Sequence, residues 1–199
     1  LLRVKGEPSP VELMLRPMDF GGKQHQAIAV RDVKARHEAE RHIRFLALHD
    51  ALTALPNRAA FNARLEQQIA SARATGMRLA VLYLDLDRFK EVNDLYGHAA
   101  GDRVLQTVAA HVGALLNDGQ MMARLGGDEF AVIVPQLASP AVAGDIAEEI
   151  QASISAGLGD GAIDTIQTSI GIAIFPEDGI DRETLLMHAD TALYRAKTE

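Results

Sequence analysis

The sequence predicts an α/β fold in which helices flank a mixed β-sheet, preceded by a β-rich segment and a connector helix. Three observations support this class. Residues 79–87 form a nearly continuous apolar run, which is typical of a strand buried on both faces. Residues 59–75 place apolar side chains at helical spacing. Residues 121–134 contain two apolar runs around a glycine pair, which is the pattern of a β-hairpin.

The first 33 residues are predicted to be rich in β-structure. Strands are expected at residues 10–18 and 26–33, with a glycine turn at residues 21–23 between them. Residues 34–48 contain neither glycine nor proline and are predicted to form a helix. Three of its apolar residues have the spacing of a coiled-coil seam, namely Ala39, Ile43 and Leu46. Such a short seam fits a solvated connector helix equally well, so both interpretations stay open.

The remaining elements follow from periodicity and from the residues that end helices. Pro56 interrupts the connector helix, and Gly76 closes the helix at residues 59–75. A further helix is expected to begin near Arg88, directly after the apolar strand. Other helices are predicted at residues 98–116, 141–154 and 181–197, and a long strand is predicted at residues 165–175. Strands that alternate with helices in this way indicate a layered sheet.

Acidic residues stand at the ends of two predicted strands. Asp85 and Asp87 end the apolar run, and Asp128 and Glu129 follow the glycine pair of the hairpin. Adjacent carboxylates repel each other, and a divalent cation would offset that repulsion. Taken alone, the hairpin tip fits a solvated acidic turn equally well. The sequence contains no cysteine, and an all-oxygen site favours Mg²⁺ or Mn²⁺.

The bulk composition is that of an ordinary globular chain, with 48% hydrophobic and 24% charged residues. Residues 1–49 hold nine basic and six acidic side chains, whereas residues 50–199 hold eleven basic and twenty-one acidic ones. This acidic balance argues against binding to nucleic acid. No apolar run approaches the roughly 18 to 20 residues that span a bilayer. We therefore expect a cytoplasmic location, which is compatible with a membrane anchor elsewhere in a longer protein.

Several short segments together resemble the GGDEF family of diguanylate cyclases. They follow the order and spacing of that family: residues 50–58, 85–90, Asn93-Asp94, Gly97-His98, Gly101-Asp102, 126–130 and 189–197. The resemblance extends from about residue 46 to the end of the chain. It implies the palm-like fold that the family shares with adenylyl cyclases.

The resemblance also implies an activity, a cofactor and partners. The expected reaction condenses two GTP molecules into cyclic di-GMP and two pyrophosphates, with Mg²⁺ or Mn²⁺ as cofactor. Each domain of the family holds one GTP, so the resemblance implies a homodimer as the active form. One alternative stays open, namely a regulatory module that binds GTP and controls a cyclic di-GMP phosphodiesterase domain further along the same protein.

Individual residues receive roles from the same resemblance. The implied metal ligands are Asp85, the backbone carbonyl of Leu86, and Asp128, and the implied catalytic acids are Asp128 and Glu129. The implied substrate contacts are Asn93 and Asp102 for guanine, His98 as a further contact, and Lys90 and Lys197 for phosphates. Without the resemblance, the lysines would be surface charges, Asn93 a turn former and His98 a helix cap.

Two positions depart from the family pattern. Ala54 stands in a loop where the family usually has glycine, and we expect no effect on activity. Family members that are inhibited by their product have Arg-x-x-Asp, with five residues between its Asp and the signature. Asn117 and Gln120 occupy those two positions here, and Asp118 is out of register. The primary inhibitory site is therefore expected to be missing.

The sequence thus predicts three regions along the chain. Residues 1–33 resemble the C-terminal end of a PAS sensor domain. Residues 34–49 form the connector helix that is expected to transmit the signal of the sensor. Residues 50–199 form the GGDEF domain.

Overall fold

The computed structural model describes residues 10–158 and 166–198. The chain divides into two compact units, Leu1–Leu46 and Ala47–Glu199. The predictions made for residues 1–9, 165 and 199 lie outside the described residues.

The first unit contains the predicted β segment, a two-stranded antiparallel hairpin of β1 (Val11–Phe20) and β2 (Lys23–Asp32). Gly21 and Gly22 form its turn with φ angles of 61° and 71°, which suit a two-residue turn that only glycine adopts readily. Because this turn is so tight, both strands extend closer to it than the sequence predicts. Helix α1 (Lys34–Leu48) follows and contains no buried residue.

The second unit is built on a four-stranded sheet in the order β4-β5-β3-β6. The strands are β3 (Arg78–Leu86), β4 (Met121–Gly126), β5 (Glu129–Leu137) and β6 (Thr168–Phe175). The α/β class is confirmed, but every strand pair among the described residues is antiparallel, whereas the sequence predicts a mixture. β3 runs antiparallel to both of its neighbours, β5 and β6, and the order and direction of strands depend on contacts between residues far apart in the sequence.

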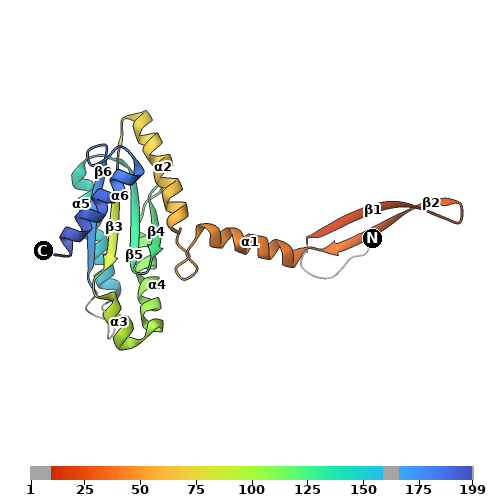
Figure 1. The fold of residues 1–199 in the computed structure, drawn as a ribbon, viewed down its shortest axis with the longest axis horizontal. Coiled ribbons are helices and arrows are strands. Elements are labelled where there is room, and N and C mark those ends of the chain that lie inside the picture. The colour runs from red at the N-terminus through yellow and green to blue at the C-terminus, as the bar shows by residue number, and fades with distance from the viewer. Residues whose placement is uncertain (1–9, 159–165, 199) are drawn as a thin grey trace. The chain divides into compact units, whose positions relative to one another are not determined.

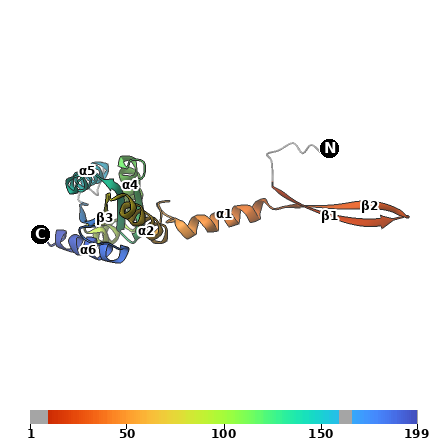
Figure 2. The ribbon, with the colours of Figure 1, turned by 90° about the horizontal axis from the view of Figure 1, so that it is seen from above.

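Helices cover both faces of this sheet (Figures 1 and 2). Helices α3 (Phe89–Tyr96), α4 (His98–Leu115) and α5 (Pro140–Leu158) pack on one face, and α2 (Arg58–Thr75) and α6 (Arg182–Ala196) pack on the other. Successive residues of β3 alternate between the two cores, with Leu82 in the first and Val81 and Tyr83 in the second. Burial on both faces explains why β3 is apolar along nearly its whole length.

The helix ends follow local capping chemistry. The Asn57 side chain accepts hydrogen bonds from the backbone N–H groups of Ala59 and Ala60 at the start of α2, and Gly76 closes that helix with a φ of 69°. Helix α5 runs beyond the predicted residues 141–154 and ends at Leu158. Its last turn contains serine and glycine, which are weak helix formers, so the sequence did not predict it. Leu158 packs against the core and supports this last turn. No helix in the described part of the chain combines the length and the apolar character needed to cross a membrane.

Candidate active site

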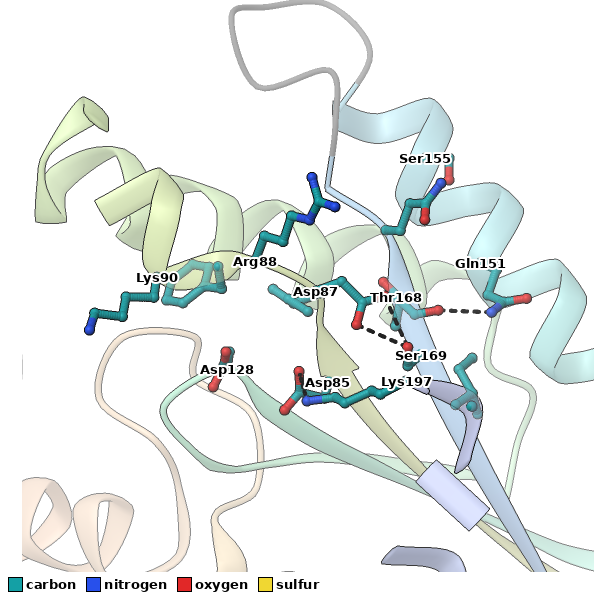
Figure 3. Close-up of a pocket in the computed structure, with 15 residues that line it drawn as sticks. Asp85, Asp87, Arg88, Lys90, Asp128, Gln151, Ser155, Thr168, Ser169 and Lys197 are labelled. Carbon is teal, nitrogen blue, oxygen red and sulfur yellow. Dashed lines mark hydrogen bonds and ion pairs between the residues drawn. The ribbon is translucent and has the colours of Figure 1, made fainter. Parts of the chain in front are cut away.

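An open cavity of about 870 Å³ lies where the central strand β3 ends (Figure 3). Its walls come from the end of β3, the loop into α3, the tip of the β4–β5 hairpin, helix α5, the start of β6 and the end of α6. Asp85 of β3 pairs in register with Glu129 of β5 on one side and with Ser169 of β6 on the other. The strand order therefore brings segments from across the whole unit to one place.

The two carboxylates predicted to bind metal, Asp85 and Asp128, both line this cavity (Figure 3). Asp128 stands in the short turn between β4 and β5, next to Gly126 and Gly127, whose φ angles are 145° and 53°. A side chain at either glycine would be strained in these conformations. The glycine pair thus permits the tight turn that presents Asp128 beside the end of β3.

Asp85 forms an ion pair with Lys197, with 2.6 Å between the carboxylate oxygen and Nζ. Burial raises the pKa of Asp85, the lysine opposes that rise, and the nearby charges of Asp128 and Asp87 add to it. The balance leaves the pKa of Asp85 above its ordinary value. A lysine ammonium therefore already occupies part of the space where a cation would offset the repulsion between the carboxylates.

The residues of the cavity fit a hard divalent cation. Asp85, Asp128 and Leu86 all line it, and the two carboxylates offer the hard oxygen ligands that such a cation takes. Among the described residues no group of three or more His, Cys, Asp or Glu side chains could hold a metal ion. Mg²⁺ suits this limited set, because it retains several water ligands and is commonly bound by one or two carboxylates together with substrate phosphates.

The loop between β3 and α3 places basic side chains at the cavity. Lys90 and Arg88 both line it, and Lys90 lies in the first turn of α3. The predicted helix start near Arg88 is confirmed, because α3 begins at Phe89, and Arg88 precedes it with a left-handed φ of 58°. This conformation turns the chain sharply from the strand into the helix. Lys90 and Lys197 thus line the same cavity as the two carboxylates, and in Figure 3 Lys197 reaches Asp85 whereas the Lys90 side chain extends away from it.

The sequence analysis assigned no role to a second group of polar residues in the cavity. The hydroxyl of Ser169 donates to the Asp87 carboxylate at 2.9 and 3.0 Å. The amide nitrogen of Gln151 on α5 donates to the carbonyl oxygen of Thr168 at 2.8 Å. The place of Asp87 at the cavity could have been predicted, because it stands two residues after Asp85 and therefore on the same face at the end of β3. The other residues have no signal in the sequence, because β6 and α5 reach the cavity only through the tertiary fold.

The residues assigned to guanine lie on α3 and α4, outside the set that lines the cavity. A Cβ atom added to Gly101 would lie 2.2 Å from Oδ1 of Asn93. The Asn93 amide therefore packs directly against α4, next to the exposed Asp102. His98 is the first residue of α4 and is exposed. Asn93 of α3 thus packs against α4 at Gly101, the residue that precedes Asp102.

Glu129 is held away from the cavity by a different set of contacts. Its carboxylate accepts a hydrogen bond from Arg58 of α2 at 3.1 Å, and Glu129 does not line the cavity. Arg58 also donates to the carbonyl oxygen of Leu125 at 3.2 Å. This arginine therefore fixes the hairpin from the α2 side, and Glu129 takes part in that attachment.

A second arginine attaches the hairpin tip to the loop before α2. Arg124 donates to both oxygens of Asp50, at 2.9 and 3.1 Å, and to the carbonyl oxygen of Gly127, at 2.7 and 3.0 Å. Burial raises the pKa of Asp50, but hydrogen bonds from Thr53 and Arg124 outweigh that effect and hold the pKa below its ordinary value. We call Asp50, Thr53, Arg124 and Gly127 the hairpin clamp. It connects the start of the second unit to the residue that precedes Asp128.

Comparison with known proteins agrees with this site. The family profile described as "Diguanylate cyclase, GGDEF domain" matches residues 47–199. Diguanylate cyclase TpbB of Pseudomonas aeruginosa is 48% identical over 155 residues, covering 77% of this chain and 36% of that protein. A Caulobacter vibrioides protein described as an uncharacterized signaling protein is 42% identical over 202 residues, covering 98% of this chain and 25% of that protein. The cyclic di-GMP phosphodiesterase PdeR of Escherichia coli is 39% identical, covering 83% of this chain and 25% of that protein. The chain thus spans between 25% and 36% of the length of these relatives.

Solved structures show the same fold. The GGDEF domain of TpbB from Pseudomonas aeruginosa matches with a TM-score of 0.70 at 47% identity, covering 73% of this chain and 92% of that one. The coiled coil and GGDEF domain of DgcB from Caulobacter crescentus, solved in complex with cyclic di-GMP, matches with a TM-score of 0.73 at 32% identity. That match covers 83% of this chain and 88% of the other. The chain therefore belongs to the GGDEF family of diguanylate cyclase domains.

Proposed function

We propose that two copies of this chain condense two GTP molecules into cyclic di-GMP and two pyrophosphates. One observation supports this proposal most strongly: Asp85 and Asp128, from different parts of the sequence, line one cavity together with Lys90 and Lys197. Phosphoryl transfer requires the charge of a triphosphate to be neutralised and the attacking oxygen to be held in line. Charge neutralisation would come from a cation held by the two carboxylates and from the two lysines. The attacking oxygen would come from the GTP held by a second copy of the chain.

Within this proposal each residue has a defined task. Asp85, Asp128 and the Leu86 carbonyl would hold Mg²⁺ or Mn²⁺, which when bound neutralises phosphate charge and polarises the phosphorus–oxygen bonds. Lys90 and Lys197 bind the phosphate oxygens. Asp128 also assists removal of the proton from the attacking 3′-hydroxyl. Glu129 is the supporting acid. Its carboxylate accepts a hydrogen bond from Arg58, and this contact holds the hairpin in place.

Recognition of guanine is assigned to the pair on α3 and α4. The Watson–Crick edge of guanine offers adjacent N–H donors, which match the Asp102 carboxylate, and Asn93 supplies both a donor and an acceptor. The contact of Asn93 with Gly101 supports this assignment, because it places the amide against α4 at the residue that precedes Asp102. His98, exposed at the start of α4, is assigned a further substrate contact.

We also propose how the three regions of the chain divide the work. Residues 1–33 belong to the end of a PAS-like sensor, and residues 34–49 form the connector that transmits its signal to the GGDEF domain at 50–199. The solved DgcB structure, which contains a coiled coil and a GGDEF domain, supports this reading of the connector as a dimerising helix. We place the domain in the cytoplasm, where GTP is available.

The second candidate function is a regulatory module. PdeR, described as a cyclic di-GMP phosphodiesterase, is 39% identical to this chain over 170 residues. This match supports a GTP-binding GGDEF domain that controls a phosphodiesterase domain elsewhere in a longer protein. The presence of both Asp85 and Asp128 at the cavity favours catalysis, since a module that only binds GTP does not require both.

The deciding experiment incubates the chain with GTP and Mg²⁺ and analyses the nucleotide products by chromatography. The proposal predicts cyclic di-GMP and pyrophosphate from the wild type, and none from Asp128→Ala. Asp118→Ala is the matched control, because Asp118 is an exposed carboxylate in the loop before β4 and does not line the cavity. GTP binding without product in the wild type would favour the regulatory module.

A further inference from the structure

Asp87 and Ser169 form a hydrogen-bonded pair at the cavity, and the function proposed above gives neither of them a task (Figure 3). Asp87 directly follows β3, and Ser169 is the second residue of β6. The Ser169 hydroxyl donates to both oxygens of the Asp87 carboxylate, at 2.9 and 3.0 Å. Ser169 is only 8% exposed, whereas Asp87 is half-buried and lines the cavity. A buried hydroxyl thus holds a carboxylate at the wall of the cavity.

The backbone of Asp87 is attached to the same edge of the fold. Its N–H group donates to the carbonyl oxygen of Gln167, the residue before β6, at 2.9 Å. Ser169 itself pairs in register with Asp85 across β3 and β6. Directly paired residues have neighbouring side chains on one face of a sheet. The serine that holds Asp87 therefore also lies beside Asp85, so the pair fixes Asp87 relative to that carboxylate.

The negative charge of Asp87 has no positive partner in the part of the chain that the structure describes. No basic side chain there forms an ion pair with it, whereas Asp85 pairs with Lys197. Burial is the main cause of the raised pKa of Asp85, and the charge of Asp87 adds to that rise. The two carboxylates therefore repel each other, and a cation bound at Asp85 would offset this repulsion.

Asp87 is not arranged as a third direct ligand beside Asp85 and Asp128. Among the described residues, no group of three or more His, Cys, Asp or Glu side chains could hold a metal ion. A carboxylate that does not bind the ion itself still attracts it through its charge. Loss of such an outer partner weakens metal binding by about 10- to 100-fold in known sites. An outer partner acts most strongly when it is held in place, and the Ser169 hydroxyl holds Asp87.

We propose that Ser169 is a positioning residue, which holds the Asp87 carboxylate so that its charge strengthens binding of a divalent cation at Asp85 and Asp128. The presence of the cation rests on the proposed function, and the task of the pair goes beyond it. The alternative is that the hydrogen bond only attaches β6 to the turn after β3. Cation binding requires the negative charge of Asp87, whereas such an attachment requires only an oxygen that accepts a hydrogen bond.

The test measures binding of Mn²⁺ to the chain without nucleotide, from the electron paramagnetic resonance signal of the free ion, together with thermal melting. Asp87→Asn retains an oxygen that accepts from Ser169 but removes the charge. It should weaken Mn²⁺ binding by about tenfold and leave the melting temperature unchanged. Ser169→Ala should weaken binding by about threefold, because the carboxylate is no longer held. The double variant should bind Mn²⁺ no more weakly than Asp87→Asn, because the serine acts through Asp87.

Two matched controls lie outside the cavity. Asp118→Asn removes an exposed carboxylate from the loop before β4, and Ser153→Ala removes the hydroxyl of a half-buried serine of α5. Neither control should change the affinity for Mn²⁺. Asp118→Asn changes the net charge of the chain by the same amount as Asp87→Asn, so it separates the local charge of Asp87 from the overall charge.

Three outcomes would overturn the positioning role. Unchanged Mn²⁺ affinity in Asp87→Asn would show that the hydrogen bond only attaches β6 to the turn. A loss in Ser169→Ala that persists in full in the Asp87→Asn background would show that the serine acts by another route. Absence of Mn²⁺ binding to the wild type would remove the site on which the pair acts.

Product analysis separates this proposal from the proposed activity. If the variants lose Mn²⁺ affinity as expected and the wild type makes no cyclic di-GMP, the catalytic function fails and the positioning role stands. If the wild type makes cyclic di-GMP and its Mn²⁺ affinity does not depend on Asp87, the catalytic function stands and the positioning role fails.

Discussion

Two carboxylates near the hairpin tip, Asp50 and Asp85, each form an ion pair, and the two pairs differ in how they are held. Asp50 accepts hydrogen bonds from the backbone N–H and the hydroxyl of Thr53, at 2.9 and 2.7 Å, and both of its oxygens accept from Nη1 of Arg124, at 2.9 and 3.1 Å. Asp85 has a single ion-pair partner among the described residues, Lys197. The first carboxylate is surrounded by fixed donors, and the second depends on one flexible side chain.

The pKa shifts of the two carboxylates have opposite directions. Burial acts to raise both, but the donors around Asp50 bring its pKa below the ordinary value, whereas the pKa of Asp85 stays above it. Folding therefore favours the charged form of Asp50 and disfavours that of Asp85. We conclude that the hairpin clamp stabilises the fold, whereas the charge of Asp85 does not, which agrees with our proposal that Asp85 and Lys197 serve the binding of a cation and a phosphate.

The largest expected effect is that of Asp85→Asn. Synthesis of cyclic di-GMP should fall at least about a thousandfold, or about 4 kcal/mol of transition-state stabilisation. The free chain should be equally stable or more stable, because the raised pKa of Asp85 means that its charge opposes folding at neutral pH. Since that penalty appears as pH rises through the folded pKa, the stability gain should be larger at pH 7 than at pH 4. Activity assays and thermal melts at both pH values measure the two effects.

Asp118→Asn is the control for this variant, because it removes an exposed carboxylate from outside the cavity. It should leave both activity and melting temperature unchanged. If Asp85→Asn instead lowers stability substantially, the pair with Lys197 contributes to the fold in the same way as the hairpin clamp, and the contrast between the two pairs is lost.

The next largest effect is expected for Arg124→Ala. Loss of its bonds to Asp50 and Gly127 should destabilise the chain by about 2 kcal/mol, since a partly buried carboxylate loses a charged partner. Turnover should also fall by about tenfold, because the turn that presents Asp128 is no longer held. Arg124→Lys should restore part of the stability but less of the rate, because lysine lacks the planar fork of donors. Urea denaturation and GTP turnover measure these values.

The control for Arg124→Ala is Arg64→Ala, which removes an exposed arginine of α2 and should change neither quantity. A fall in stability without any change in rate would show that the hairpin tip keeps its shape without the clamp. Arg124 would then be a purely structural residue.

A smaller effect is expected from the acid titration of Asp50. Its lowered pKa contributes stability above about pH 4, the ordinary range of an aspartate, and this contribution is lost as pH falls through the folded pKa. The side chain is 24% exposed, so we expect a modest contribution of about 1 kcal/mol. Asp50→Asn should lower the free energy of unfolding at pH 6, and its difference from the wild type should shrink toward pH 3. A difference that is independent of pH would exclude the charge as its cause.

The smallest effect is expected in the first unit. Arg36 and Glu40 form an ion pair on α1 with 2.8 Å between the charged atoms, yet their side chains are 72% and 45% exposed. Solvent screens such pairs, and many of them contribute nothing measurable. Arg36→Ala should therefore leave the melting temperature unchanged in the same assay that detects Arg124→Ala. A clear fall in melting temperature would show that a short distance between the charged atoms is enough for an ion pair of this chain to stabilise the fold, even when the pair is exposed.

Local features of the sequence were sufficient to predict most elements of the fold. The apolar run of β3 indicates a buried strand, Gly126-Gly127 indicates the hairpin, and Pro56 and Gly76 bound the helix that became α2. These predictions succeed because hydrophobic periodicity, glycine at positive φ and helix capping depend only on neighbouring residues. The left-handed Ala54, Arg88 and Gln136 are local exceptions, since nothing in their residue types indicates that conformation.

Partners that are distant in the sequence could not be predicted in this way. The tertiary structure alone decided that β3 lies between β5 and β6 and runs antiparallel to both. The same order brings Thr168 and Ser169 to the cavity that Asp85 and Asp128 share. It also decided that Glu129 turns to Arg58, and that Arg124 binds Asp50. The physical reason is that side-chain partners and strand neighbours result from long-range packing, which no local pattern of residues specifies.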